Sequence, residues 1–303
     1  MLSVVIPAYD EEQMLHKTAE TIKTILDNEK IEFEILFVND GSKDDTWNLI
    51  SEEGKNDARI RGVGFSRNFG KESAIFAGLA EVKGDCTVVI DCDLQHPPIK
   101  IVEMYKLWEQ GYEVIEGVKS SRGKESRLHA MAAKMFYNMI SKASGIDMSR
   151  ASDFKLLDRK VVDELLKLPE KAAFFRALSS WVGFKTIQIE YDVQQREEGV
   201  SKWSTKSLIK YAISNITSFT TLPMQIVSVI GVIMMVLSVV CLISFIYKSS
   251  INTNMALLFL LLGLQCFIGG VILIGIGIVG YYISKIYDEV KKRPRYIISQ
   301  RIN

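Results

Sequence analysis

The stretch CTVVIDCDLQ, residues 86–95, decides the fold of this 303-residue chain. Its first five residues are apolar apart from one threonine, and they run directly into Asp91, with a second aspartate, Asp93, two positions later. A run that is apolar on consecutive residues is typical of a strand covered on both faces of a parallel sheet. The sequence therefore predicts a buried strand that ends on two carboxylates.

Further runs of this kind precede and follow that strand. They are SVVIPAY (3–9), FEILFVND (33–40), RGVGFS (61–66) and YEVIEGV (112–118). Segments with apolar residues at helical spacing lie between them, at residues 15–26, 44–56, 71–82 and 99–109. This alternation of strand and helix predicts an α/β domain with a mostly parallel, Rossmann-like sheet and helices on both faces.

Composition and simple motifs exclude several classes of protein. Lys plus Arg total 37 and Asp plus Glu total 36, so a net charge of +1 offers no broad basic field for nucleic acid. The cysteines Cys86, Cys92, Cys241 and Cys266 lack CxxC spacing, which indicates neither a disulfide framework nor a zinc site. No P-loop motif occurs, and the GxGxxG at 275–280 lies in an apolar segment, where it indicates helix packing.

Polar residues follow four of the predicted strands, at the edge where open parallel sheets bind ligands. They are Tyr9, Asp10 and Glu11, then Asn39, Asp40 and Gly41, then Ser66 and Arg67, and finally Asp91 and Asp93. Residues two apart on an extended segment point the same way, so Asp91 and Asp93 can face one ligand. A divalent cation bound to nucleotide phosphates takes one or two protein carboxylates, although paired surface aspartates are also common.

Two long segments without a charged residue, 222–247 and 255–283, follow this domain. Each exceeds the roughly 20 residues that span a bilayer, whereas two buried core helices would need a covering layer that the remaining chain hardly provides. Basic residues precede the first segment and follow the second, while the short connection carries Lys248 alone. By the positive-inside rule, we expect a hairpin in the inner or plasma membrane with both termini cytoplasmic. The chain also opens without a secretory signal pattern, which favours a cytosolic N-terminal domain.

The segment just before the first span is amphipathic. Apolar residues from Leu208 to Phe219 form one helical face, and Lys202, Lys206 and Lys210 form another. An amphipathic core helix would look similar, but the position next to a span favours an interfacial helix on anionic headgroups. We therefore expect a cytosolic domain at 1–203, an interfacial helix at 204–221, a transmembrane hairpin at 222–284 and a basic cytosolic tail at 285–303.

Six motifs, in order, resemble those of the family 2 glycosyltransferases of GT-A fold. They are SVVIPAYDEE (3–12), FVNDGSKDDT (37–46), SRNFGKESA (66–74), VVIDCDLQHPP (88–98), SDFKLLDR (152–159) and REEGVSKWS (196–204). The chain is most similar to the polyisoprenyl-phosphate glycosyltransferases, in particular the bactoprenol glucosyltransferase type with two C-terminal spans. Dolichol-phosphate mannose synthase is a more distant relative of this type. The resemblance covers essentially the whole chain.

The resemblance implies a role for each matching residue. Those that would line the nucleotide base and ribose are Pro7, Tyr9, Glu11, Asp40 and Asp91. Asp93 would hold Mg²⁺ or Mn²⁺ on the diphosphate, with Gln95 as a further ligand, and Asp153 stands at the position of the catalytic carboxylate. Those that would bind phosphate or acceptor are Arg67, Arg196, Lys202 and Trp203. His96 departs from the pattern, because the family commonly has an acidic residue after the glutamine.

The implied reaction is the inverting, metal-dependent transfer of one sugar from a nucleoside diphosphate sugar to a polyisoprenyl (undecaprenyl) phosphate. UDP-glucose is the expected donor, and UDP-N-acetylglucosamine and GDP-mannose are the alternatives. The acceptor is a phosphate monoester with a second pKa of about 6, so it is largely ionised at neutral pH. Asp153 is therefore expected to take up little proton and to orient the sugar or the acceptor.

Other readings of the sequence remain open. A processive synthase is disfavoured because SKW replaces the QxxRW box and two spans form no polymer channel. A non-catalytic, membrane-anchored nucleotide-binding protein would not need Asp91, Asp93 and Asp153 together. Two uncharged spans offer no polar path for a lipid transporter, so a separate flippase and a downstream glycosyltransferase are expected partners. Glycines in the second span favour a homo-oligomer.

Overall fold

The computed structural model describes residues 1–120, 152–168, 174–192 and 254–303. The chain divides into two units, one formed by Met1–Thr205 with Pro294–Asn303 and the other by Lys206–Arg293. Several sequence predictions lie outside the described residues: Arg196, Lys202, Trp203, the interfacial helix at 204–221 and the first span at 222–247.

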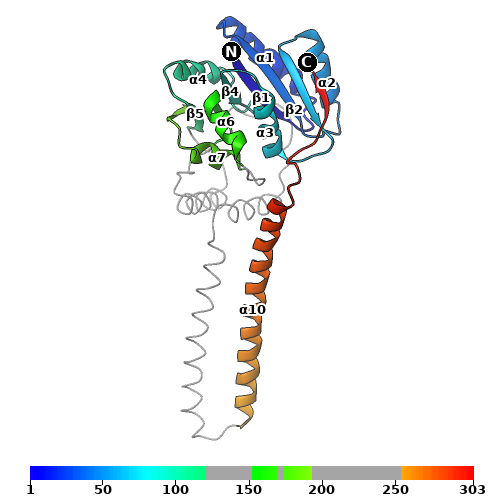
Figure 1. Ribbon diagram of the computed structural model, residues 1–303, viewed down its shortest axis with the longest axis vertical. Helices are drawn as coiled ribbons and strands as arrows, with labels where there is room; N and C mark the ends of the chain where they lie inside the picture. Colours follow the sequence, from blue (N-terminus) through cyan, green and yellow to red (C-terminus); the bar gives the residue numbers. More distant parts are fainter. Residues whose placement is uncertain (121–151, 169–173, 193–253) are drawn as a thin grey trace. The chain divides into compact units, whose positions relative to one another are not determined.

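The first unit is built on a sheet that has eight strands in the described residues (Figure 1), in the order β7-β5-β6-β4-β1-β2-β3-β8. The strands are β1 (Leu2–Ala8), β2 (Phe33–Asn39), β3 (Ile60–Phe65), β4 (Cys86–Val89), β5 (Val114–Lys119), β6 (Lys155–Asp158), β7 (Thr186–Tyr191) and β8 (Ile298–Ile302). β1 pairs in parallel with β2 and β4, and β2 with β3, which confirms the predicted parallel core. β6 is antiparallel to both β4 and β5, whereas β5 and β7 are parallel.

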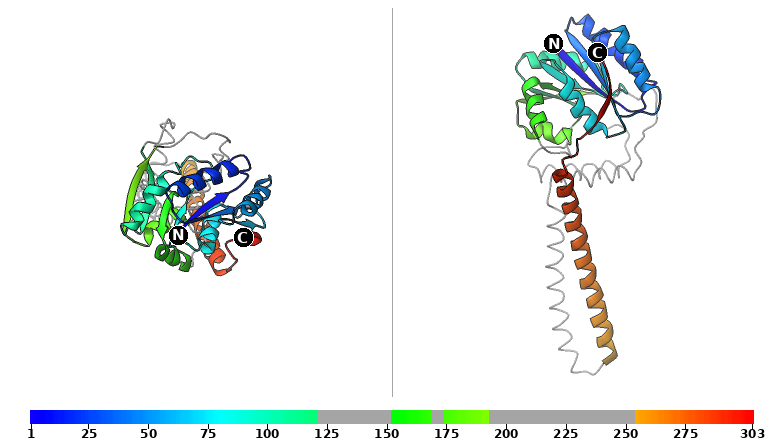
Figure 2. Two further views of the ribbon diagram at one scale, coloured as in Figure 1. Left: turned by 90° about the horizontal axis from the view of Figure 1, so that it is seen from above. Right: turned by 45° about the vertical axis from the view of Figure 1, so that its right-hand side comes forward.

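Helices cover both faces of the sheet (Figure 2), as the sequence predicts. They are α1 (Leu15–Asn28), α2 (Thr46–Asn56), α3 (Lys71–Glu81), α4 (Lys100–Glu109), α6 (Arg159–Lys167) and α7 (Phe175–Trp181). The first four match the predicted segments to within two residues. α3 contacts β1 and β2 and lies beside α6, while α4 contacts β5 and β6.

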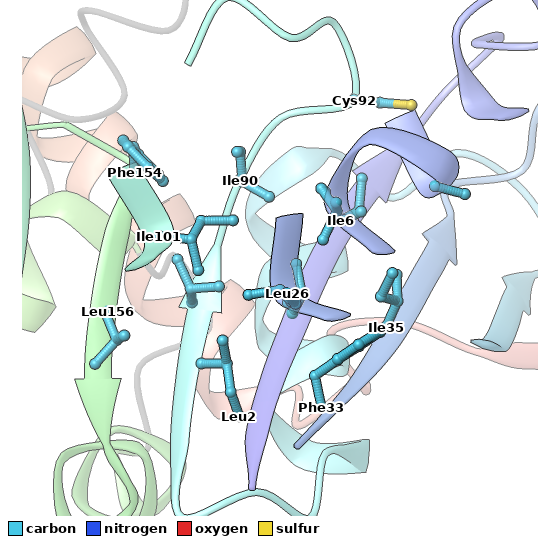
Figure 3. Packing of buried hydrophobic residues seen from close by; sticks show 14 of the residues in the cluster. Leu2, Ile6, Leu26, Phe33, Ile35, Ile90, Cys92, Ile101, Phe154 and Leu156 are labelled. Atoms are coloured by element: carbon cyan, nitrogen blue, oxygen red, sulfur yellow. The ribbon is translucent and has the colours of Figure 1, made fainter. Parts of the chain in front are cut away.

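One core on the α1 side of the sheet packs α1, α2 and α4 against the strands (Figure 3). Leu2 and Ile6 of β1, Ile35 of β2 and Leu26 of α1 are fully buried within it. Side chains alternate between the two faces of a strand, so the consecutive apolar residues of β1 also fill the opposite face. The continuous apolar runs in the sequence are therefore strands buried on both sides.

The C-terminal residues differ from the basic tail expected at 285–303. Helix α10 (Asn254–Val290) continues beyond Lys285, and β8 pairs antiparallel with β3 at the edge of the sheet. The amide of Asn303 donates to the carbonyl oxygens of Gly54 (2.5 Å) and Ile60 (2.9 Å), and Arg301 pairs with Glu81 at 2.7 Å. Residues 298–303 therefore form part of the sheet rather than a solvated tail, and a five-residue edge strand is too short to show a clear period.

Helix α10 belongs to the second unit and contains the predicted span 255–283. Among the described residues it is the one helix long and apolar enough to cross a membrane, over Phe267–Tyr287. Many of its apolar side chains are exposed, among them Ile272, Ile276 and Ile283. A helix that is apolar around its circumference is typical of a membrane span or of the interior of a large protein.

Gly41, directly after β2, provides a test of how closely the loops after β2 and β3 approach each other. Its φ is +68°, and a Cβ atom there would lie 2.4 Å from the carbonyl carbon of Arg67. Gly111 has a φ of +88° but nothing within 4 Å of the corresponding position. We expect Gly111→Ala to cost on the order of 1 kcal/mol, through conformation alone, and Gly41→Ala to lower the melting temperature of the detergent-purified protein considerably more. An equal fall in melting temperature in the two variants would show that the loops after β2 and β3 are not in close contact.

Candidate active site

The loops that follow β1 and β2 are hydrogen-bonded to each other. The backbone N–H of Asp10 donates to Oγ of Ser42 (2.9 Å), and the N–H of Lys43 donates to Oδ1 of Asp10 (2.8 Å). The N–H of Ser42 donates to Oδ1 of Asn39 (3.0 Å). These contacts fix one side of the edge at which the parallel strands end.

Three of the residues predicted to contact the nucleotide lie on this side. Pro7 is in β1, and Tyr9 and Glu11 are in the loop after it, all partly exposed. The N–H of Glu11 donates to Oγ1 of Thr46 (2.9 Å), while its carbonyl oxygen accepts from the N–H of Leu15. The backbone of Glu11 therefore joins the start of α1 to the start of α2. Base and ribose contacts by the three side chains stay predictions.

Asp40, also predicted to bind the nucleotide, is buried and accepts two backbone hydrogen bonds. Its carboxylate accepts from the N–H of Phe69 (2.7 Å) and of Gly70 (2.9 Å). Burial raises the pKa of Asp40, and these two hydrogen bonds partly oppose the rise. Gly70 immediately precedes α3, so Asp40 fixes the point at which α3 begins. Its contact with a nucleotide stays a prediction.

The centre of the site is a cluster of ion pairs around Asp153. Nζ of Lys71, the first residue of α3, lies 2.6 Å from Oδ1 of Asp91 and 2.9 Å from Oδ2 of Asp153. Arg176 of α7 binds Asp153 through two nitrogens, Nε to Oδ1 and Nη2 to Oδ2, both at 2.7 Å. The structure thus brings together Asp91 and Asp153, which are far apart in sequence.

These contacts keep Asp153 ionised. Burial alone would raise the pKa of Asp153, but Arg176 and Lys71 hold it well below its ordinary value. Burial would likewise raise the pKa of Asp91, but Lys71 lowers it; burial would lower the pKa of Lys71, but Asp153 and Asp91 raise it. A carboxylate with such a low pKa is a poor proton acceptor at neutral pH. Asp153 is better suited to hold cations in place than to act as a general base.

Asp93 lies beside this cluster in a tight turn. It is 8% exposed, and its Oδ1 accepts from the N–H of Gln95 (3.1 Å). Leu94, between them, has a φ of +55°, a conformation that is costly for a residue with a side chain and that concentrates at functional sites.

Asp93 and Gln95 fit a nucleotide-bound Mg²⁺ or Mn²⁺. In the part of the chain that the structure describes, no group of three or more His, Cys, Asp or Glu side chains could hold a metal ion. A cation that takes one or two protein carboxylates and completes its coordination with phosphate oxygens and water does not require such a group. The oxygen donors of Asp93 and Gln95 are also of the type that these two ions prefer.

His96, where the family pattern has an acidic residue, is buried against aromatic rings. Its ring stacks on Phe154 with centroids 5.2 Å apart and meets Tyr191 edge-on at 5.5 Å. Nδ1 lies 3.9 Å from Oδ2 of Asp91. Burial lowers the pKa of His96 and Asp91 only partly opposes this, so His96 is neutral at neutral pH. An uncharged imidazole ring therefore stands where the family commonly has an acidic side chain.

Arg67, the described member of the predicted phosphate or acceptor set, is in the exposed loop after β3. Its guanidinium lies 4.3 Å from the centroid of the Phe69 ring. The other three members of that set are outside the described residues.

Sequence reasoning missed Lys71, Glu72 and Arg176. Lys71 and Glu72 belong to the SRNFGKESA motif and begin a helix after a parallel strand, a position where residues meet the binding edge. The sequence alone could therefore have identified Lys71 and Glu72 as candidates. Arg176 lies in no quoted motif, and only the folded structure brings it to Asp153.

Comparison with known proteins places this geometry in a family. A model described as "Glycosyl transferase family 2" matches residues 3–166. The chain is 39% identical over 304 residues to the uncharacterized glycosyltransferase YkcC of Bacillus subtilis (strain 168), over 98% of this chain and 93% of that protein. It is 35% identical over 305 residues to the SfII prophage-derived bactoprenol glucosyl transferase of Shigella flexneri, over 99% and 97% of the two chains.

Solved structures share the fold at low sequence identity. Glucosyl-3-phosphoglycerate synthase from Mycobacterium tuberculosis in complex with Mg²⁺ and uridine-diphosphate is 18% identical, with a TM-score of 0.52 over 72% of this chain and 79% of that one. The same protein in complex with Mn²⁺, uridine-diphosphate-glucose and phosphoglyceric acid gives 19% identity and a TM-score of 0.51 over the same shares. At this identity the likeness establishes the fold and no more.

The raised pKa of Glu72 predicts how the stability of the protein changes with pH. Glu72 accepts a hydrogen bond from the N–H of Phe175 (2.9 Å), and burial together with Asp153 raises its pKa to about 7 from an ordinary 4.5. The folded chain therefore binds this proton more tightly than the unfolded chain, so the free energy of unfolding falls as the pH rises from about 4.5 to about 7. With allowance for partial exposure, the fall is on the order of 2 kcal/mol.

Denaturant unfolding between pH 5 and 8 measures this effect. Glu72→Gln retains an acceptor for Phe175 and is expected to remove the slope, whereas Glu103→Gln on the surface of α4 should preserve it. An unchanged slope in Glu72→Gln would assign the effect to another group.

Proposed function

The chain belongs to glycosyl transferase family 2, and we propose that it transfers a single glucosyl residue from UDP-glucose to undecaprenyl phosphate at the cytosolic face of the membrane. The broader statement, that the protein is a glycosyltransferase, follows from the family and from the relatives that share nearly its whole length. The name of the Shigella relative, bactoprenol glucosyl transferase, supports the choice of sugar and of lipid acceptor.

One observation carries the proposal. Asp91, Asp93 and Asp153 lie at the edge where ligands bind to open sheets, and two cations, Lys71 and Arg176, pair with Asp153. A transferase that uses a nucleoside diphosphate sugar needs carboxylates on the donor side and positive charge for phosphate groups. A cluster of three carboxylates and two cations has no evident structural purpose at the ends of strands.

On the donor side, the residues hold and orient the nucleotide. We assign Pro7, Tyr9, Glu11, Asp40 and Asp91 to the nucleoside. Asp93, with Gln95, would hold Mg²⁺ or Mn²⁺, which when bound supplies positive charge against the negative charge that develops on the leaving diphosphate. Mg²⁺ and Mn²⁺ in solved structures of the same fold with bound uridine-diphosphate or uridine-diphosphate-glucose support a divalent ion in this reaction. The neutral stack of His96, Phe154 and Tyr191 adds no further negative charge at this point.

On the acceptor side, the attacking oxygen belongs to a phosphate monoester that is mostly ionised near pH 7. Asp153 is 6% exposed in its side chain, whereas Lys71 and Arg176 are 36% and 27% exposed. The buried carboxylate thus holds two cations whose accessible portions can bind an anionic acceptor. Arg67 and, outside the described residues, Arg196, Lys202 and Trp203 would add to this attraction. A single displacement by the phosphate oxygen inverts the anomeric carbon.

A lipid acceptor explains the apolar C-terminal segments. We propose that α10 spans the membrane as the second member of a hairpin whose first span is 222–247, with residues 204–221 at the interface and both termini cytoplasmic. The exposed apolar side chains of α10 support a membrane span at this helix. Association of second spans into a homo-oligomer, and a separate flippase and downstream glycosyltransferase, are parts of the same proposal.

Transfer of radiolabel tests the function. Purified protein in detergent is incubated with undecaprenyl phosphate and labelled UDP-glucose, UDP-N-acetylglucosamine or GDP-mannose, with Mg²⁺, Mn²⁺ or EDTA, and the lipid is extracted. We expect metal-dependent label in the organic phase from UDP-glucose. Label from another donor would correct the sugar, and no label from any donor, with nucleotide bound to folded protein, would contradict the proposed reaction.

The roles of the two aspartates are separable by substitution. At saturating donor and metal, we expect Asp153→Asn to reduce kcat about 10-fold and Asp93→Asn at least 100-fold, because loss of an electrostatic contact to the leaving group typically costs 10²–10³. A general base at Asp153 would instead contribute roughly 10²–10⁴. Asp163→Asn, on the exposed face of α6, serves as the control. Equal losses in Asp153→Asn and Asp93→Asn would contradict an orienting role for Asp153.

A further inference from the structure

A buried ion pair lies behind the site and takes no part in the chemistry described so far. Glu116 of β5 and Lys155 of β6 are partners in the sheet, with side chains 6% and 1% exposed and Nζ of Lys155 3.0 Å from Oε1 of Glu116. Removing two charges from water costs several kcal/mol, and well-packed apolar residues can often replace such a pair without loss of stability. Stability alone therefore does not account for this pair.

Glu116 holds the backbone from which Asp153 projects. Oε1 of Glu116 accepts from the N–H of Ser152 (3.1 Å), the residue directly before Asp153. Its other oxygen, Oε2, accepts from Nε2 of Gln188 in β7 (3.0 Å). Strand β6 begins only at Lys155, so at Ser152 this side-chain contact takes the place of a ladder hydrogen bond.

Lys155 holds the helix that carries Arg176. Its Nζ donates to Oγ of Ser179 (2.8 Å) and, at 3.4 Å, to Oγ of Ser180 and to the carbonyl oxygen of Arg176. These three residues belong to α7, which has seven residues. A helix this short owes its position to tertiary contacts rather than to its own stability.

We propose that Glu116 and Lys155 are positioning residues, which together set the distance between Asp153 and Arg176. One member of the pair fixes the segment that bears the carboxylate, the other fixes the helix that bears the guanidinium, and their mutual ion pair joins the two. Both side chains are buried, so we assign neither of them a contact with substrate. The inference rests on the proposed function insofar as Asp153 and Arg176 serve the transfer reaction.

A double substitution, Glu116→Met with Lys155→Met, tests the proposal. It removes both charges together and leaves no buried charge without a partner. We expect a melting temperature close to that of the unsubstituted protein, a kcat at least 10-fold lower and a KM for the donor changed by less than about 3-fold. The matched control is Glu113→Met with Lys160→Met, which removes an exposed pair, 3.2 Å apart, near the same strands; its kcat should not change.

A kcat unchanged in a folded double variant would overturn the proposal, as would a loss of activity in proportion to a loss of folded protein. If the double variant does not fold, Ser179→Ala with Ser180→Ala removes the hydrogen bonds from Lys155 to the two serine hydroxyls of α7 without altering either charge. That variant should also lower kcat, by at least 3-fold, with little change in the KM for the donor. An unchanged kcat there would count equally against the proposal.

A crystal structure of the double variant separates this inference from the proposed function. We expect the distance from Nε of Arg176 to Oδ1 of Asp153 to lengthen beyond hydrogen-bonding range, from 2.7 Å. This result is expected whether or not the unsubstituted protein transfers glucose to a polyprenyl phosphate. An unchanged 2.7 Å contact would overturn the positioning role, whereas absence of transfer by the unsubstituted protein would overturn only the proposed reaction.

Discussion

The site depends on one interaction, the bridge that Lys71 makes between Asp91 and Asp153. The carboxylates of Asp91 and Asp153, with side chains 27% and 6% exposed, repel each other, so without Lys71 one would take up a proton or the two would move apart. The bridge in turn depends on where α3 begins, because Lys71 is its first residue. Asp40 fixes that point through the backbone of Phe69 and Gly70. Asp40, directly after β2, thus fixes the start of the helix whose first residue bridges the carboxylates after β4 and before β6.

The sequence predicts the strands from β1 to β5, but it does not predict β6, β7 and β8. Runs of consecutive apolar residues identify the strands buried on both faces, from β1 to β5, because burial on two sides leaves an unambiguous pattern. β6 has four residues, and β7 and β8 are partly exposed, so each offers too little periodicity to distinguish it from a loop. The antiparallel pairings of β6 and β8 arise from long-range contacts that no local pattern encodes.

The site likewise contains residues that stand out in the sequence and others that only the folded structure identifies. Asp91 and Asp93 stand out in the sequence because they directly follow an apolar run, and Asp153 stands out because it lies in a motif of the resemblance; their roles stay predictions. Arg176 and the pair formed by Glu116 and Lys155 do not stand out, since their roles exist only once α7 and the strands β5 and β6 are packed. Asp40 illustrates an intermediate case. Its motif indicates importance, but the structure shows its oxygens engaged with the backbone, a function that residue type alone does not reveal.

The place of β8 in the chain has a consequence for biosynthesis. β3 is a sheet edge until β8 pairs with it, and β8 follows the 37-residue helix α10 in the sequence. During translation, the sheet therefore exposes an unpaired edge while more than 200 residues are still being added, a state that favours association with other chains. Residues 298–302 thus complete a sheet whose first strand is formed by residues 2–8. Synthesis of the C-terminal segments and maturation of the enzyme domain are thereby coupled in time.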